Sequence, residues 1–154
     1  MVSQAASTAA GSKDHVATTY NDGLLAWGGA TDAKFRLTDM RRFDFASATA
    51  SVVAASGTIP TGRFGHTGVQ YEGYWYMFGG WDGHNTLDET LVYDLANDAW
   101  CASDYLPSGT GINGDKPTDR YQHSATLIGH QMFIYGGTQR RWRWRWRRWC
   151  LRQQ

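Results

Sequence analysis

The chain has 154 residues, a length typical of one domain, and its 42% hydrophobic residues are enough for a packed core, which excludes general disorder. Its 18 glycines and 14% aromatic residues favour short strands and turns over a helical bundle. The net charge of +1 is unevenly distributed: residues 1–139 carry 8 basic and 14 acidic side chains, whereas residues 140–154 carry 7 arginines and no acid. No segment approaches the roughly 20 apolar residues that span a bilayer, which excludes a transmembrane helix.

The first residues, 1–12, are small and polar. They lack the apolar centre of a secretory signal, and we expect them to form a disordered lead-in. Cys101 and Cys150 have neither metal-site spacing nor the number needed for a disulfide framework, and the chain has no Asn-x-Ser/Thr acceptor. The expected location is therefore the reducing cytoplasm.

Three segments, residues 15–29, 66–80 and 123–137, share one pattern. Each begins with His and contains a strand, a tight turn and a second strand that ends in aromatic-Gly-Gly. The turns contain Asn, Asp or Gly, which supply the positive φ of a two-residue hairpin. The segments begin 51 and 57 residues apart, a period that indicates an internal repeat.

Two further strands are predicted after the first and second hairpins. They cover residues 38–44 and 51–54 in the first copy, and residues 88–94 and 99–102 in the second. Each of these copies is then a four-stranded antiparallel unit of about 50 residues, which is the size of a propeller blade.

The residues at fixed positions of the repeat resemble the Kelch repeat family, whose pattern is Arg-x-x-His, a diglycine, Tyr-Asp and Trp. The second copy has all four parts: Arg63, His66, Gly79-Gly80, Tyr93-Asp94 and Trp100. The third copy has Arg120, His123 and Gly136-Gly137, and the first has His15, Gly28-Gly29 and Phe43-Asp44. The first copy departs from the pattern with Ser12 for Arg and Ala50 for Trp, which leaves a gap for a neighbour to fill.

This resemblance implies an all-β, Kelch-type β-propeller architecture over residues 13–139. We expect blade 1 at about 13–56, blade 2 at about 63–106 and a partial blade 3 at about 120–139. Two full blades and an incomplete third do not close a ring, which typically needs about four to eight blades. The chain is therefore interpreted as a fragment or truncated member, and its unpaired blade edges predict self-association.

The repeated residues have expected structural roles. The glycines allow close backbone approach, and Tyr93 and Trp100 pack within and between blades. His15, His66 and His123 invite a metal-site hypothesis, but equivalent positions of successive blades do not converge on one ion. We expect these histidines to form blade hydrogen bonds, and we predict no metal site.

In Kelch-like propellers the ligand face is built from the loops between strands 2 and 3 and between strand 4 and the next strand 1. The resemblance therefore implies a non-catalytic module that binds a protein partner through these loops. For Arg63 and Arg120 a structural ion pair is an equal alternative. The predicted partner-binding residues are Arg36, Arg63, Trp81, Asp82, His84, Asn85 and Arg120, and the same loops contain Thr31, Asp32, Lys34, Thr61, Asn113, Asp115 and Lys116.

No nucleophile with a base, acid/base pair or metal cluster is apparent, so no enzyme activity and no cofactor are predicted. A fragment of a galactose-oxidase-like enzyme is a distant alternative, which would need a copper site with His and Tyr ligands. Residues 109–114 spell Gly-x-Gly-x-x-Gly, but they stand between Pro107 and Pro117 without a following helix, so we expect an enlarged loop.

The last segment, residues 140–154, is rich in Arg and Trp and lies outside the repeat. If genuine, it could bind anionic lipid, RNA or single-stranded DNA, since Arg pairs with phosphate and Trp enters the lipid interface or stacks on bases. The favoured alternative is an out-of-frame translation of a longer third blade. A CGATGG codon repeat that encodes Arg-Trp would encode Asp-Gly in another frame, and Asp-Gly suits the position after a Kelch diglycine.

Overall fold

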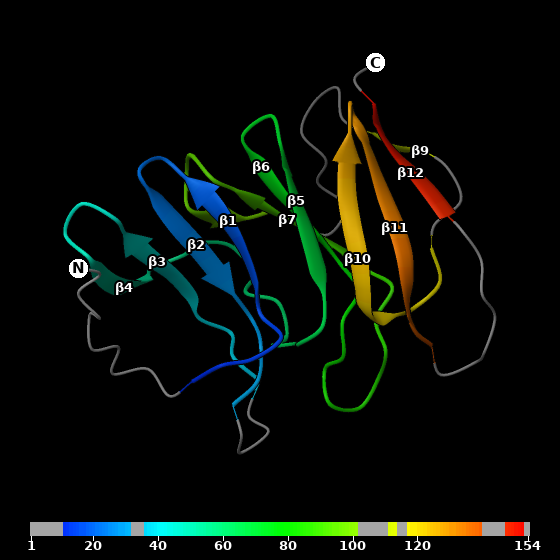
Figure 1. The fold of residues 1–154 in the computed structure, drawn as a ribbon, viewed down its shortest axis with the longest axis horizontal. Coiled ribbons are helices and arrows are strands. Elements are labelled where there is room, and N and C mark those ends of the chain that lie inside the picture. Colours follow the sequence, from blue (N-terminus) through cyan, green and yellow to red (C-terminus); the bar gives the residue numbers. More distant parts are fainter. Residues whose placement is uncertain (1–10, 32–35, 102–110, 114–116, 140–146, 153–154) are drawn as a thin grey trace, which may run out of the picture.

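The computed structural model describes residues 11–31, 36–101, 111–113, 117–139 and 147–152, and every regular element within these ranges is a β-strand. The strands form three antiparallel four-stranded sheets that stand side by side (Figure 1). None of the described residues belongs to a helix long and apolar enough to cross a membrane.

Blades 1 and 2 are built from consecutive strands, in the sheet orders β1-β2-β3-β4 and β5-β6-β7-β8. The strands of blade 1 are β1 (Val16–Tyr20), β2 (Gly23–Trp27), β3 (Met40–Asp44) and β4 (Thr49–Val53). The strands of blade 2 are β5 (Thr67–Tyr71), β6 (Tyr74–Phe78), β7 (Thr90–Asp94) and β8 (Ala99–Trp100). The all-β architecture of two complete four-stranded repeats predicted from the sequence is confirmed.

The hairpin turns follow the chemistry of their residues. Tyr20 pairs with Gly23 across the first turn, where Asn21 has φ 51°, and Tyr71 pairs with Tyr74 across the second, where Glu72 and Gly73 have φ 48° and 82°. In the second turn, two successive positive φ values give a twist that matches the twist of the flanking strands. The turn therefore fixes which residues of each strand share a face.

Blade 3 combines repeat strands with strands from outside the repeat. Its sheet order is β10-β11-β12-β9, with bounds β10 (Tyr121–Ile128), β11 (Gln131–Thr138), β12 (Arg147–Arg152) and β9 (Gly111–Asn113). The first two strands are those that the sequence predicted. The expectation that residues 109–114 are all loop was wrong for Gly111–Asn113, which pairs with β12. β12 in turn pairs with β11, whose outer edge offers backbone hydrogen-bonding groups to a further strand.

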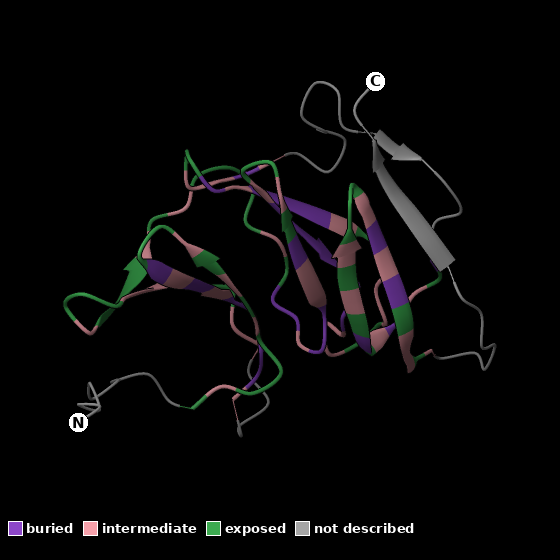
Figure 2. Ribbon diagram, turned by 45° about the horizontal axis from the view of Figure 1, so that its top comes forward, coloured by how far each residue is buried: buried purple, intermediate pink, exposed green. Residues whose placement is uncertain are grey.

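The core consists of two apolar layers between the blades. Trp75 and Met77 of β6 belong to the layer shared with blade 1, whereas Tyr76 and Phe78 belong to the layer shared with blade 3. This alternation follows from the two-residue period of a strand, and it buries both faces of blade 2 (Figure 2). Blade 1 contributes Leu25, Trp27 and Met40 to the first layer, and blade 3 contributes Met132 and Ile134 to the second.

A backbone hydrogen-bond ladder joins the blades where each first strand begins. The Gly65 N–H donates to the Asp14 carbonyl at 2.9 Å, and the Gln122 N–H donates to the Gly65 carbonyl at 2.6 Å. These three residues directly precede the repeated histidines, and all have positive φ, at 59°, 65° and 55°. The strands that follow them lie side by side, with β5 in contact with both β1 and β10.

The diglycines of blades 1 and 2 each contact the following blade. The Gly29 N–H donates to the Arg63 carbonyl at 2.7 Å, and the Gly80 N–H donates to the Arg120 carbonyl at 2.8 Å. A Cβ on Gly28 would lie only 2.6 Å from His66 Cε1. The close approach of successive blades therefore requires glycine at this position.

Candidate functional site: a hollow between the loops of blades 1 and 2

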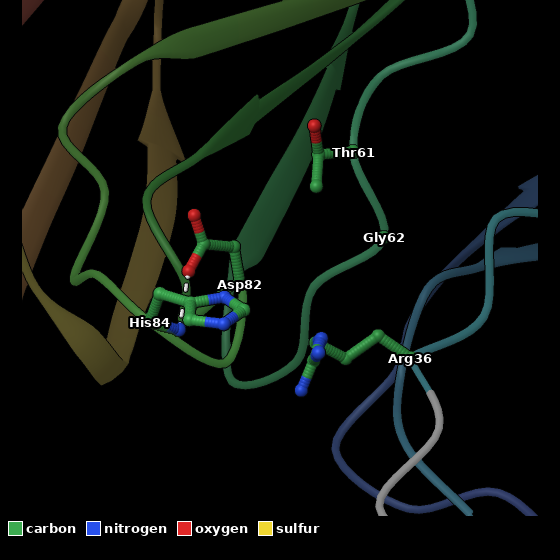
Figure 3. A pocket seen from close by; sticks show the side chains of 5 residues that line it. All are labelled: Arg36, Thr61, Gly62, Asp82 and His84. Atoms are coloured by element: carbon green, nitrogen blue, oxygen red, sulfur yellow. Dashed lines mark hydrogen bonds between the residues drawn. The ribbon is translucent and has the colours of Figure 1, made fainter.

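A hollow of about 330 Å³ lies where the loops of blades 1 and 2 meet. Three separate connections line it: the β2–β3 loop, the β4–β5 connection and the β6–β7 loop. The lining residues are Arg36, Thr61, Gly62, Asp82 and His84. Figure 3 shows Arg36 reaching towards it from blade 1, with Asp82 and His84 on the side of blade 2. Three of the residues predicted for partner binding are thus brought together across a blade junction.

Asp82 organises the β6–β7 loop. Its Oδ1 accepts hydrogen bonds from the backbone N–H of His84 at 2.7 Å and of Asn85 at 2.6 Å, and the Asp82 N–H donates to the Asn85 carbonyl at 3.2 Å. Burial acts to raise the pKa of Asp82, but the hydrogen bonds from Asn85 and His84 outweigh it and leave the pKa below its usual value. The loop therefore presents a fixed carboxylate, with His84 and Asn85 exposed beside it.

Arg36 brings a cation to the opposite side of the hollow. Its side chain lies over Gly83, where an added Cβ would overlap the guanidinium group. Gly83 has φ 99°, so both its conformation and its lack of a side chain suit this approach. The hollow thus carries a guanidinium, a carboxylate, an imidazole and the Thr61 hydroxyl, which can recognise charged and polar groups of a partner.

Arg63 directly follows the lining residue Gly62 and is only 1% exposed. Its Nε donates to the Thr61 carbonyl at 3.2 Å, its Nη1 donates to the Gly79 carbonyl at 3.3 Å, and its Nη2 pairs with Glu89. The guanidinium also lies 5.7 Å from the ring centre of Trp27 in blade 1. These contacts hold the β4–β5 connection against the blade junction.

Arg120 repeats this arrangement in blade 3, where it is 2% exposed. It donates to the Thr118 carbonyl at 3.1 Å and to the Gly136 carbonyl at 3.0 Å. The sequence left open whether these two arginines contact a partner or make structural bonds. The structure places both guanidinium groups below the surface, where they bond to the loop and to the diglycine of their own blade.

The other predicted residues are dispersed. Trp81 pairs with Phe64 and lies 5.9 Å from the ring of Tyr121, at the junction of blades 2 and 3 instead of in the hollow. Thr31 is half-buried in the described part of the β2–β3 loop. The remaining loop residues lie outside the described residues or, for Asn113 in β9, have no described side chain: Asp32, Lys34, Asn113, Asp115 and Lys116.

The repeated histidines differ in their surroundings. His66 packs edge-on against Trp27 of blade 1 at 5.1 Å, and His123 packs against Phe78 of blade 2 at 5.6 Å. Nε2 of His123 is 2.7 Å from the Thr67 hydroxyl, whereas both ring nitrogens of His66 lack a hydrogen-bond partner. The expected blade hydrogen bond is therefore present for His123 and absent for His66. Within the described ranges no group of three potential metal ligands occurs.

Burial controls the protonation of the two inner histidines. It lowers the pKa of His66 to about 3, with further contributions from the charges of Arg63, His123 and His15. The pKa of His123 falls to about 4, again first through burial and then through Arg120. Both imidazoles are therefore neutral at physiological pH, and each packs against an aromatic ring of the preceding blade. Neither of them lines the hollow.

Sequence reasoning missed two kinds of contact. Gly62 and Gly83 shape the hollow, and the only sequence signal for them is their place beside Thr61 and Asp82 in the two loops. Arg42 of β3 bonds Asp98 of the β7–β8 turn through both carboxylate oxygens at 3.0 Å, which joins blades 1 and 2. Nothing in the local sequence pairs these two residues, because they are 56 positions apart.

The comparisons with known proteins agree with this architecture. A model of the KLHDC2/KLHL20/DRC7 Kelch-repeats domain matches residues 2–142. Kelch domain-containing protein 3 of Rattus norvegicus is 28% identical over 80% of this chain, which corresponds to 31% of that protein.

Two other relatives contain similar segments within larger proteins. Acyl-CoA-binding domain-containing protein 5 of Arabidopsis thaliana is 31% identical over 78% of the chain and 18% of its own length. A probable serine/threonine-protein kinase of Dictyostelium discoideum is 34% identical over 54% of the chain and 6% of its own length. The chain thus spans less than a third of the length of each of these relatives.

Proposed function

The chain belongs to the Kelch-repeat family, and on this premise we propose that it binds a protein partner through its strand 2–3 and strand 4–1 loops and catalyses no reaction. Kelch repeats generally mediate protein–protein interactions. The identity of the partner depends on the loops of this chain, since loops on a rigid scaffold determine specificity.

The observation that carries the proposal is the hollow between blades 1 and 2. It gathers side chains from three connections that are far apart in the sequence, on a frame fixed by the buried Arg63. A rigid scaffold that presents polar groups from several loops around one concavity is the usual form of a recognition site. Arg36 can bind a carboxylate of the partner, and the carboxylate of Asp82 can accept a hydrogen bond from a donor group of the partner.

The test compares two triple variants of the chain. Arg36→Ala/His84→Ala/Asn85→Ala removes polar groups around the hollow but keeps Asp82, whose hydrogen bonds shape the loop. The matched control is Ser51→Ala/Thr126→Ala/His130→Ala, three exposed residues on strands and a hairpin turn away from these loops. Proteins captured from an extract of the expressing cells by the wild-type chain are identified, purified and titrated against both variants.

We expect the loop variant to weaken the Kd by at least about tenfold, as loss of a polar hot spot does, and the control to leave it unchanged. Equal affinities of the two variants would contradict the proposal. A further variant, with Arg140, Arg141, Arg143 and Arg145 changed to Gln, tests the anionic-surface alternative. If binding depends on residues 140–154, the affinity falls steeply as the salt concentration rises, and the four Arg→Gln changes abolish it. If binding depends on the loops, the four changes leave the affinity unaltered.

A further inference from the structure

Three aromatic rings meet where blades 2 and 3 join, on the same side of the blades as the hollow. Phe64 lies in the β4–β5 connection, Trp81 lies in the β6–β7 loop, and Tyr121 begins β10. The ring of Tyr121 lies 5.9 Å from that of Trp81, at 49°, and 6.3 Å from that of Phe64, at 86°. All three side chains are half-buried, so part of this aromatic cluster lies at the surface.

The aromatic cluster and the hollow are built by the same two segments. The β4–β5 connection contributes Gly62 to the hollow and Phe64 to the cluster, and the β6–β7 loop contributes Asp82 to the hollow and the preceding Trp81 to the cluster. Backbone hydrogen bonds in both directions join Phe64 and Trp81, at 3.2 and 2.9 Å. A bridge between Trp81 and Thr86 closes the loop. A peptide that crosses these two segments therefore meets polar groups and aromatic rings within a few residues.

Blade 1 shows that the fold does not require aromatic residues at these positions. Lys13 and Ala30 occupy the repeat positions of Phe64 and Trp81, and they form the same pair of backbone hydrogen bonds, at 3.0 and 2.9 Å. In blade 3 the equivalent pair is Tyr121 and Thr138. The backbone contact thus forms with different side chains, and the aromatic cluster is a property of this part of the surface and not a requirement of the repeat.

The rings of the cluster are held in place before any partner binds. Phe64 and Trp81 are fixed through their backbone bonds, and Tyr121 packs beside Gly65, where an added Cβ would lie 3.4 Å from Tyr121 Cδ2. Large rings with few rotatable bonds give much contact area at a low entropy cost, and Trp and Tyr are enriched among interface hot spots. A fixed ring surface binds an apolar side chain with little further ordering.

We propose that the aromatic cluster is the second half of the loop site, and that the partner binds through an extended peptide segment. One apolar side chain of this segment packs on the rings of Trp81, Tyr121 and Phe64, and a neighbouring acidic side chain enters the hollow towards Arg36. The inference rests on the proposed function and adds the chemistry of the partner segment. The hollow of about 330 Å³ is small for a ligand pocket, which suits a side chain better than a folded element.

The charges of these loops favour a protein segment over a nucleic acid. Bases also stack on aromatic rings, but single-stranded nucleic acids need a positively charged groove for their phosphates. Arg63 and Arg120 are only 1% and 2% exposed, and each bonds the diglycine of its own blade. The carboxylate of Asp82 lies between the hollow and the cluster in the chain and would repel a phosphate.

The test selects ligands from a phage-displayed library of random heptapeptides, each inserted within a loop of the coat protein so that no peptide terminus is free. We expect the peptides enriched on the wild-type chain to carry an apolar residue within a few positions of an acidic one. Enriched sequences are then synthesised with blocked termini and a fluorescent label. Fluorescence anisotropy measures the Kd of each peptide for the chain and its variants.

Two variants copy the residues of blade 1: Trp81→Ala introduces the residue found at Ala30, and Phe64→Lys the residue found at Lys13. Since blade 1 forms the same backbone contact with these residues, we expect both variants to fold, as checked by circular dichroism. Each weakens the Kd by about tenfold or more, whereas Trp81→Phe, which keeps a ring, changes it by less than about threefold. The matched control Phe45→Ala removes a 58% exposed ring beside the β1–β2 turn and leaves the Kd unchanged.

Three results would overturn the inference. The first is a library that yields no enriched peptide. The second is a peptide whose Kd is weakened by the triple loop variant but not by Trp81→Ala, which removes the cluster from the site and leaves the proposed function intact. The third is a Trp81→Ala chain that is unfolded, together with a folded Phe64→Lys chain of unchanged Kd, which gives the rings a structural role. Failure of the proposed function is seen separately, when the triple loop variant binds the captured partner as the wild-type chain does.

Discussion

The middle blade and the two end blades are all four-stranded antiparallel sheets, but they differ in burial. In blades 1 and 2 the four strands have nearly the same pairing, and all three blades have the diglycine at positive φ. Gly79 and Gly80 of blade 2 are enclosed, and its His66 is buried, whereas His15 of blade 1 is exposed and Gly136 of blade 3 is open.

This comparison separates two determinants of the structure. Turn residues and strand alternation produce a blade wherever the repeat occurs, because they act over a few neighbouring residues. Burial of the positions that recur in the repeat depends instead on a neighbouring blade on each side.

The largest contrast is expected between Gly79→Ala and Gly136→Ala. Both changes put a side chain at positive φ, which costs about 1–2 kcal/mol, but the Cβ at position 79 would also lie 2.5 Å from the Arg120 carbonyl oxygen. Overlap with packed atoms adds about 1–3 kcal/mol, so we expect about 2–5 kcal/mol for Gly79→Ala and about 1–2 kcal/mol for Gly136→Ala. Urea unfolding of the two variants measures both losses.

Equal losses of unfolding free energy at the two positions would contradict this expectation. They would mean that backbone strain alone, and not the neighbouring blade, makes glycine necessary after the aromatic residue.

The second contrast concerns pH and the buried histidines. The pKa of His66 is lowered to about 3 in the folded chain, so at intermediate pH the unfolded chain binds a proton that the folded chain does not. Stability is then complete above the ordinary pKa of 6.5 and is lost as the pH falls towards 3. At pH 5, about 1.5 pH units below 6.5, the loss is about 2 kcal/mol at roughly 1.4 kcal/mol per pH unit.

Urea midpoints between pH 5 and 7.5 measure this dependence in the wild-type chain and in two variants. We expect His66→Gln to reduce the slope of stability against pH, and the control Thr126→Gln, at an exposed residue that does not titrate, to leave it unchanged. His123, whose pKa is lowered to about 4, supplies the slope that remains. A slope that His66→Gln does not alter would show that the side chain is not held neutral by the junction.

The smallest effect is expected where blade 1 lacks an arginine. Arg63 and Arg120 each donate to the first glycine carbonyl of their own blade, and Ser12 occupies this position in blade 1. Ser12→Arg should therefore bond the Gly28 carbonyl and stabilise the chain by about 0.5–1.5 kcal/mol in urea unfolding. Ser12→Lys is the control, since it adds the charge without the planar fork. Equal stabilisation by both would attribute the effect to charge alone.

Much of the blade architecture could be predicted from the sequence, because its determinants are local. The turn residues and the spacing from His to Gly-Gly locate six strands, and the aromatic positions of β6 indicate that both faces of blade 2 are buried. Loop residues Arg36, Asp82 and His84 were predicted from a resemblance to known repeats, which identifies the loops that share a face but not the contacts within them.

Other features depend on residues that are distant in the sequence. The pairing of β11 with β12 and of β12 with β9 fills a sheet edge that the repeat leaves open, and no local pattern selects the strand that fills it. The burial of Arg63 and Arg120 depends on where the neighbouring diglycine carbonyls lie. From the sequence alone, a repeated arginine is compatible with either a binding role or a structural role, because the sequence does not show where those carbonyls lie.

The sequence by itself thus determined the strands of the repeat, their turns and the positions at which one blade can approach another, since these properties depend on φ preferences and on the two-residue period. Only the tertiary structure decided which of those positions are occupied. Gly79 and Gly136 have nearly the same φ, 70° and 73°, and they differ because blade 3 packs against Gly79, whereas a Cβ added to Gly136 would meet no described atom within 4 Å.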